Sequence, residues 1–317
     1  MSPSESESSV ANAPQYVELP LVDTHAHVNL EDFNDDLEEL LARSRSGRFP
    51  EIRGRQLGDA VVRPFVAGLI CPGVDYATSR RALNLAKSHD YVYAAAGVHP
   101  NHVALLQPDE WHNICKLVAD EVGAGTGDCR IVALGETGLD KYWDDAPFTM
   151  QVDYFCRTLE LGRLRKLPVI IHSRDANDDL DAILHEFYGS QTPDWPVGVI
   201  HSFSGTPVQA ERWLELGFCL GFGGFVTYTQ KRFSDIWEAA KLAPADRILL
   251  ETDSPFLTPH PVRGKIDRNE PLMTAFTARR LAELRGVSAL EIAQTSTENA
   301  RRLFKLPRLA SAPGVDC

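Results

Sequence analysis

The stretch LVDTHAHVNL, residues 21–30, places two histidines one residue apart at the end of an apolar, strand-like run. Alternate side chains of an extended strand point to the same face, so the imidazoles of His25 and His27 can both reach one metal ion. An HxH pair alone is a weak signal, because a single histidine at a strand end commonly has a structural role. Its meaning depends on the residues that the rest of the chain brings beside it.

Further residues of the types that bind metals follow later apolar runs. The carboxyl ends of such runs are where a parallel barrel gathers its functional side chains. Clustering buried imidazoles and carboxylates without a cation leaves costly polar groups, which argues against a packing role. Six ligands exceed the usual four of one zinc ion, so the pattern favours two divalent ions that share a carboxylate. The candidate ligands are His25, His27, Glu136, His172, His201 and Asp253.

Eight apolar runs alternate with segments of helical periodicity, and this alternation predicts the fold. Near-continuous apolar strands are typical of a parallel sheet covered by helices. Eight units over roughly 250 residues predict a closed (β/α)8 TIM barrel of the α/β class. An open doubly wound sheet is the alternative, but it requires a glycine-rich turn that does not follow the first run. The runs lie at residues 19–25, 63–70, 91–98, 130–136, 167–172, 196–201, 217–224 and 247–253.

Helices are expected where apolar residues recur at intervals of three and four. Residues 1–15 and 307–317 offer little to bury, so we expect disordered tails on either side of one barrel domain at residues 16–306. The expected helices span residues 31–44, 79–89, 108–122, 150–165, 176–188, 207–217 and 233–241.

Charge and composition restrict the function. The net charge of −12 argues against a surface that coats polyanions or binds anionic membranes. The apolar runs are too short to span a bilayer, no signal peptide is recognisable, and the six cysteines are scattered, so we expect a cytoplasmic protein with reduced thiols. Residues 43–63 hold six arginines against two acidic residues. A barrel places this segment away from the active site, which favours a solvated loop over an auxiliary nucleic-acid contact.

In combination, the motifs resemble the TatD family of metal-dependent deoxyribonucleases within the amidohydrolase superfamily. The resemblance rests on DTHAH, AAGVHP, LGETGLD, VIIHSRDA, HSFSG, ETDSPFL and RNEP, and covers residues from about 20 to 306. It implies a binuclear TIM-barrel phosphodiesterase, usually a 3′ to 5′ exonuclease, that hydrolyses DNA from its ends with a metal-activated water. Single-stranded ends are the expected substrate.

The resemblance also implies a ligand scheme. His25, His27, Glu136 and Asp253 would hold one ion, and Glu136 would bridge to a second ion held also by His172 and His201. Four imidazoles favour zinc or manganese, whereas the resemblance is compatible with magnesium.

Catalytic and substrate-binding roles follow from the same motifs. Asp253 and Glu136 are the candidate catalytic carboxylates, with Asp253 as the acid/base, and His99 matches a family position close to the substrate phosphate. Arg174 is the nearest cation for a second phosphate oxygen. The loop after the eighth run adds basic residues where a nucleic-acid backbone could lie, although such loops are equally often solvated. These residues are Arg263, Lys265 and Arg268.

Two residues adjacent to the candidate ligands are expected to support them. Asp23 and Glu251 lie two positions before His25 and Asp253 and share their strand faces, so we expect them to hold ligands in place rather than to bind metal.

Two other functions stay open at this point. The same activated water would attack a carbonyl in a D-aminoacyl-tRNA deacylase or another ester or amide hydrolase. A metal-stabilised binding protein without turnover is the alternative of a different class. The sequence does not separate DNA from RNA and carries no signal of oligomeric state.

Overall fold

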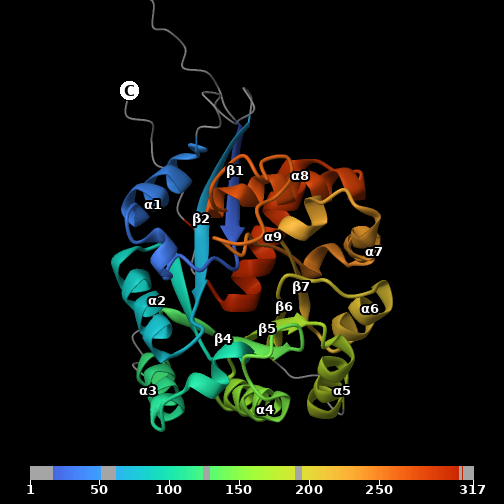
Figure 1. The fold of residues 1–317 in the computed structure, drawn as a ribbon. Coiled ribbons are helices and arrows are strands. Elements are labelled where there is room, and N and C mark those ends of the chain that lie inside the picture. The colour runs from blue at the N-terminus through green and yellow to red at the C-terminus, as the bar shows by residue number, and fades with distance from the viewer. Residues whose placement is uncertain (1–16, 51–61, 124–128, 190–194, 307–308, 310–317) are drawn as a thin grey trace, which may run out of the picture.

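A parallel eight-stranded barrel forms the centre of the protein (Figure 1). The computed structural model describes residues 17–50, 62–123, 129–189, 195–306 and 309. Each strand pairs in parallel with the next one along the chain, and each coincides with one of the eight predicted runs, so the predicted (β/α)8 fold is confirmed. The strands are β1 (Val17–Asp23), β2 (Val62–Pro72), β3 (Val92–Ala96), β4 (Ile131–Asp140), β5 (Val169–Arg174), β6 (Gly198–Ile200), β7 (Cys219–Phe222) and β8 (Ile248–Leu250).

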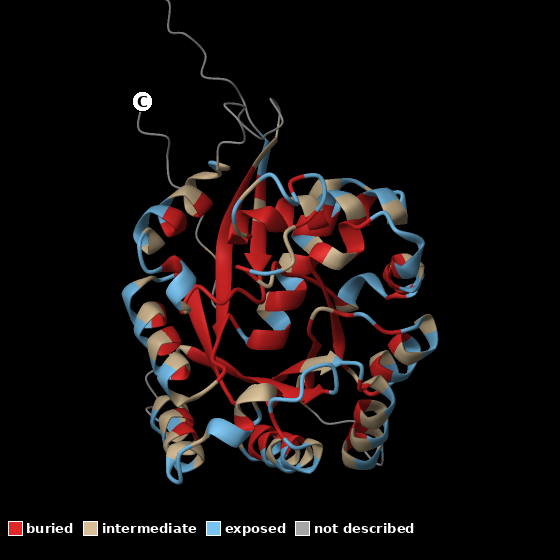
Figure 2. Ribbon diagram, viewed as in Figure 1, coloured by how far each residue is buried: buried red, intermediate tan, exposed pale blue. Residues whose placement is uncertain are grey.

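Helices surround the barrel, with their apolar faces buried against the strands and their polar faces exposed (Figure 2). All seven expected helices are present, although the first begins six residues later than predicted. Phe33 fits the helical spacing but is buried by a separate turn of 3-10 helix. The helices are α1 (Leu37–Ser46), α2 (Tyr76–Ser88), α3 (Glu110–Gly123), α4 (Phe148–Arg165), α5 (Asn177–Tyr188), α6 (Pro207–Glu215), α7 (Ser234–Leu242), α8 (Thr274–Arg285) and α9 (Ala289–Phe304).

Helices α8 and α9 were not among the expected elements, and α9 closes one end of the barrel. Its residues Leu303 and Phe304 pack with inward-facing strand residues such as Ile70 and Leu249. The side-chain amide of Asn299 donates to the carbonyl of Ile248, at the amino end of β8. The helix therefore fills the amino end of the barrel and leaves the carboxyl end open for a site.

Backbone hydrogen bonds close the barrel between β8 and β1. The amide of Thr24 donates to the carbonyl of Leu250 at 3.0 Å. Beyond the strand ends, the amide of Asp253 donates to the carbonyl of His25, and the amide of His27 donates to the carbonyl of Ser254, both at 2.8 Å. The bonds that close the barrel thus hold two ligand-bearing segments in a fixed register.

Several expectations fall partly outside the described residues. The predicted tails lie outside the described residues, apart from Leu309, which packs against the apolar cluster that contains Leu303 and Phe304 of α9. Residues 51–61 of the arginine-rich segment also lie outside. No helix of the described ranges is long and apolar enough to cross a membrane. The expected solvated loop is wrong for most of the described arginines of that segment, because Arg43 and Arg45 lie in the last turn of α1 and Arg63 lies in β2. All four described arginines bond within the protein: Arg43 to Glu270, Arg45 to the Val66 carbonyl, Arg48 to Ser46 and Arg63 to Glu18.

Shortening a buried side chain of α9, the helix that fills the amino end of the barrel, should destabilise the fold. Phe304 is 2% exposed, so we expect Phe304→Ala to lower the free energy of unfolding by about 3–5 kcal/mol through lost contacts and a cavity. Urea denaturation followed by circular dichroism measures this change. Leu164→Ala, on the exposed side of α4, is the control and should change stability by less than about 0.5 kcal/mol. Equal effects of the two substitutions would contradict the assigned role of α9.

Candidate metal centre and active-site cavity

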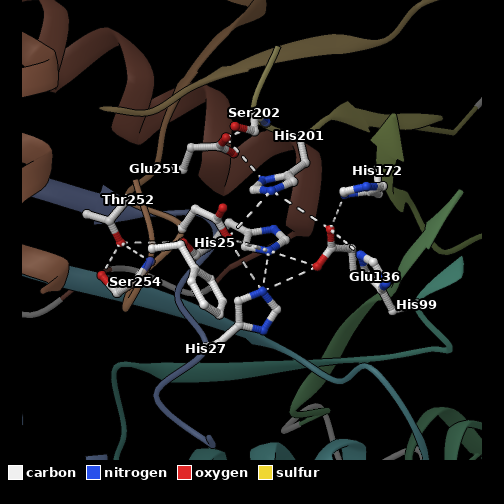
Figure 3. Close-up of polar contacts among 12 residues, drawn as sticks. His25, His27, His99, Glu136, His172, His201, Ser202, Glu251, Thr252 and Ser254 are labelled. Carbon is white, nitrogen blue, oxygen red and sulfur yellow. Dashed lines mark hydrogen bonds and ion pairs between the residues drawn. The ribbon is translucent and has the colours of Figure 1, made fainter. Parts of the chain in front are cut away.

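The six candidate ligands converge at the carboxyl ends of the strands, where Figure 3 shows His25, His27, His172 and His201 around Glu136. Glu136 lies in β4 and His172 in β5, whereas the other four follow β1, β6 and β8. Close approach of β4 to β5 makes this possible. Gly138 has a φ of +142°, and a Cβ there would lie 2.0 Å from the carbonyl oxygen of His172, so only glycine fits.

One oxygen of Glu136 faces the HxH pair. The Nε2 atoms of His25 and His27 are 3.0 Å apart, and each lies 3.3 Å from Glu136 Oε2. Asp253 Oδ1 lies 3.7 Å from the first of these nitrogens and 3.5 Å from the second. The ligand atoms of His25, His27 and Glu136 thus lie within 4.8 Å of one another, and Asp253 lies beside the two imidazoles. This donor set suits a divalent ion such as zinc or manganese.

The other oxygen of Glu136 faces a second group of imidazoles. Glu136 Oε1 lies 2.9 Å from His172 Nδ1 and 3.9 Å from His201 Nε2. His201 Nε2 also lies 3.7 Å from Asp253 Oδ1. A carboxylate with one oxygen toward each group has the position that a bridging ligand requires.

The buried carboxylates of the cluster require compensating positive charge, and the pKa values of the neighbouring histidines reflect this. Burial disfavours protonated histidine, yet contacts with Asp253 and Glu136 raise the pKa of His27 to about 9. Contacts with Glu251 and Asp253 similarly raise the pKa of His201 to about 10. Burial opposes the charged form of Glu136, but the surrounding imidazoles hold its pKa well below the usual range. Protons thus compensate the carboxylates in the metal-free protein, and divalent ions would fit the same residues.

His99 differs from the other imidazoles of the cluster in its tautomer. Its Nδ1 accepts a hydrogen bond from the amide of Asn101 at 3.2 Å, and burial lowers its pKa to about 3. The neutral ring therefore carries its proton on Nε2, which lies 3.7 Å from Glu136 Oε1. A protonated Nε2 offers no lone pair to a metal, so His99 suits donation to a substrate oxygen.

Two carboxylates orient the ligand rings. Asp140 Oδ2 lies 3.1 Å from Nε2 of His172, which leaves Nδ1 of that ring facing Glu136. Burial disfavours the Asp140 carboxylate, but the bond with His172 outweighs this and lowers its pKa to about 2. Glu251 Oε1 lies 3.1 Å from Nδ1 of His201, and Glu251, His25 and His201 also form a group that could hold a metal ion.

Asp23 supports backbone rather than an imidazole. Its carboxylate accepts from the amides of His25 and Thr252 and from the hydroxyl of Thr252. It therefore fastens the segment after β1 to the segment after β8. Asp140 was missed in the sequence because β4 extends four residues beyond its predicted end.

A cavity of about 1190 Å³ opens above the cluster and is lined by loops that follow the strands. It exceeds the range of roughly 300–1,000 Å³ typical of small-ligand pockets, so it can take an extended substrate. Arg174, a predicted phosphate-binding residue, lines this cavity. Sequence reasoning missed other lining residues, although all of them follow strand ends: Asn101, His102, Trp143, Arg232 and Phe256.

The other predicted substrate-binding cations are not among the residues that line this cavity. Arg268 forms an ion pair with Asp36 and so fastens the loop after β8 to the start of α1. The guanidinium of Arg263 lies 4.4 Å above the ring of Tyr228. Lys265 is exposed. Of the four predicted cations, the structure thus brings only Arg174 to the cavity.

Comparisons with known proteins agree with this geometry. A sequence model of the family described as TatD related DNase matches residues 22–305. The chain is 37% identical to the uncharacterized metal-dependent hydrolase YabD of Bacillus subtilis over 90% of this chain and 99% of that protein. It is 34% identical to the 3′-5′ ssDNA/RNA exonuclease TatD of Erwinia tasmaniensis over 76% and 89% of the two chains. The crystal structure of YjjV, a TatD homologue from Escherichia coli, superposes with a TM-score of 0.76 at 31% identity, covering 90% of this chain and 98% of that one.

Removing divalent metal should destabilise the protein more at high pH than at low pH. The raised pKa values of His27 and His201 stabilise the metal-free fold fully below pH 6.5, and this contribution is lost as pH rises through 9 to 10. Metal binding instead requires deprotonated imidazoles, so its contribution grows with pH. At a free metal concentration one hundred times the Kd, we expect about 2.7 kcal/mol of stabilisation. Thermal unfolding with and without chelator at pH 6 and pH 9 measures the change in Tm that metal removal causes. Equal changes in Tm at the two pH values would contradict the prediction.

Asp140→Asn tests the support of His172. The substitution removes the charged acceptor beside Nε2, and we expect metal affinity to fall about 10- to 100-fold. Competition with a chromophoric chelator measures the affinity. Asp145→Asn, the same change elsewhere on the cavity wall, is the control and should leave it unchanged. If Asp140→Asn binds metal with unchanged affinity, Asp140 does not support the metal centre.

Proposed function

Because this chain belongs to the TatD-related DNase family, we propose that it is a metal-dependent nuclease that removes nucleotides from the 3′ ends of single-stranded DNA or RNA. The observation that carries the proposal is the position of Glu136, with one oxygen toward each of two ligand groups at the floor of a large cavity. The relative from Erwinia tasmaniensis is named a 3′-5′ ssDNA/RNA exonuclease, which supports a phosphodiester as the bond that is cleaved and a single strand as the substrate.

The ligand scheme follows the two sides of Glu136. His25, His27, Glu136 and Asp253 would hold one ion, and Glu136 would also contribute to holding a second ion. Bound divalent ions supply Lewis acidity toward phosphate oxygens and lower the pKa of coordinated water to about 7. The remaining ligands of the second ion are His172 and His201.

Asp253 is suited to accept the proton of the attacking water. Burial disfavours its charged form, but His201 and His27 outweigh this and lower its pKa, so it is a carboxylate at neutral pH. Its side chain is 15% exposed, which makes it the more accessible of the two carboxylates at the centre, since Glu136 is 4% exposed. A general base needs both this charge state and access to substrate water.

His99 and Arg174 would bind the phosphate. The protonated Nε2 of His99 faces Glu136 and can donate to a phosphate oxygen above it. Arg174 lies two residues after His172 in β5 and lines the cavity, so its guanidinium is a second, charged donor there. These donors hold the phosphodiester and neutralise charge that develops on it.

Replacing Glu136 should abolish turnover. Glu136→Gln removes the charge shared by both ligand groups, so we expect 3′-end trimming to fall about 10²–10³-fold or more, together with metal content. Digestion of 5′-labelled single-stranded DNA and RNA with Mg²⁺, Mn²⁺ or Zn²⁺, alongside metal analysis, measures both. Glu211→Gln, on the exposed face of α6, is the matched control.

Two results would contradict the proposal. Retention of metal and trimming in Glu136→Gln would remove the bridging role. Hydrolysis of a D-aminoacyl-tRNA by wild-type protein, with both labelled strands left intact, would assign the same centre to ester chemistry.

A further inference from the structure

Exposed aromatic side chains gather at the mouth of the cavity. Among the described residues, the aromatic side chains that are exposed are Tyr142 (54%), Trp143 (51%) and Phe256 (52%). Trp143 and Phe256 line the cavity, and the Tyr142 ring lies 4.9 Å from the Trp143 ring. Single exposed apolar residues are common on proteins, but a group of aromatics beside a catalytic cavity marks a binding surface.

The Tyr142–Trp143 pair is fixed relative to the metal centre. Asp140 Oδ1 accepts hydrogen bonds from the amides of Tyr142 and Trp143 at 2.9 and 3.1 Å. The other oxygen of Asp140 contacts His172. One carboxylate therefore positions both the aromatic pair and a candidate ligand, so the distance between ring and centre is set by the fold.

Arg174 packs against the same pair. Its guanidinium carbon lies 3.8 Å from the centre of the Tyr142 ring and 5.7 Å from that of Trp143. A cation on the Tyr142 ring holds that ring in place and adds a positive charge beside the Trp143 indole. The Tyr142 and Trp143 rings meet edge to face at 86°, and with Arg174 they form a positively charged aromatic cluster at the cavity wall.

The charge of the cavity favours a ligand that is held by stacking. The described lining contains two arginines, Arg174 and Arg232, against six carboxylates. Three of these carboxylates belong to the metal centre, so outside it two arginines face Asp145, Asp175 and Asp235, and the wall has no excess of positive charge to attract phosphates. Affinity for a nucleic acid must therefore come largely from uncharged contacts. Base–aromatic stacking supplies such contacts, and every unpaired base has a face that can stack.

We propose that Trp143, supported by Tyr142 and Arg174, stacks on an unpaired nucleobase next to the phosphodiester that lies at the metal centre. This inference rests on the proposed nuclease function and specifies how the substrate is recognised. A base inside a duplex has both faces covered by its neighbours, so stacking on Trp143 favours unpaired bases regardless of base identity.

Substitutions at Trp143 combined with abasic substrates test the stacking. Binding of a 5′-fluorescein oligothymidylate with hydrolysis-resistant phosphorothioate linkages is followed by anisotropy, and kcat and KM are measured on the normal strand. Trp143→Leu should weaken binding and raise KM about 5- to 150-fold, the loss that corresponds to roughly 1–3 kcal/mol for a stacked base, with little change in kcat. Trp143→Phe keeps a ring and should recover most of the affinity.

The abasic strand supplies the matched comparison. With abasic residues beside the 3′-terminal linkage, wild type and Trp143→Leu should bind equally, because the partner of the indole is gone. Leu164→Ala removes an exposed apolar side chain far from the cavity and should match wild type on both strands.

The outcomes separate this inference from the function on which it rests. If wild type trims the strand and Trp143→Leu changes neither binding nor KM, the nuclease function stands and the stacking is overturned. If binding depends on Trp143 and on the base but no strand is cut, the stacking stands and the nuclease function fails. Loss of a concentration-dependent dimer in Trp143→Leu, with nucleic-acid binding unchanged, would assign the surface to a protein contact and also overturn the inference.

Discussion

The side chain of Glu136 is 4% exposed and lies between two groups of imidazoles, and its burial constrains the rest of the site. A buried charge is tolerated only when positive charge and hydrogen bonds compensate it. Surrounding imidazoles such as His25 and His172 compensate it in the metal-free protein, and divalent ions would do so in the metal-bound form. The same side chains would serve both states, so we expect metal affinity, pH and stability to be coupled in this protein.

This arrangement requires segments distant in sequence to meet with little freedom. The hydrogen bonds that close the barrel join the backbone of His25 to that of Asp253, and the carboxylate of Asp23 ties both segments together. Asp140 performs a comparable role beside β5, because it contacts His172 and holds the backbone of Trp143. The proposed recognition of an unpaired base and the proposed hydrolysis therefore depend on one rigid rim, within a protein whose net charge of −12 excludes general attraction for nucleic acid.

Local pattern was sufficient to predict the barrel and the gathering of the ligand candidates. Strand periodicity and length are properties of short segments, and parallel strands in a barrel place all their carboxyl ends on one rim, so residues such as His25 and His172 meet wherever the strands close. Helices α8 and α9 were missed, since the plug formed by Phe304 depends on the space that the completed barrel leaves.

The sequence by itself determined the strand order, the identity of the candidate ligands and the family, because these depend on residue type and spacing along the chain. Only the tertiary structure decided which charged residues reach the cavity. Arg174 lines it, whereas Arg268 is paired with Asp36 of a segment more than two hundred positions away. Tertiary structure likewise decided the tautomer of His99 and the joint role of Asp140, since each is fixed by hydrogen bonds whose partners are known only once the loops have folded.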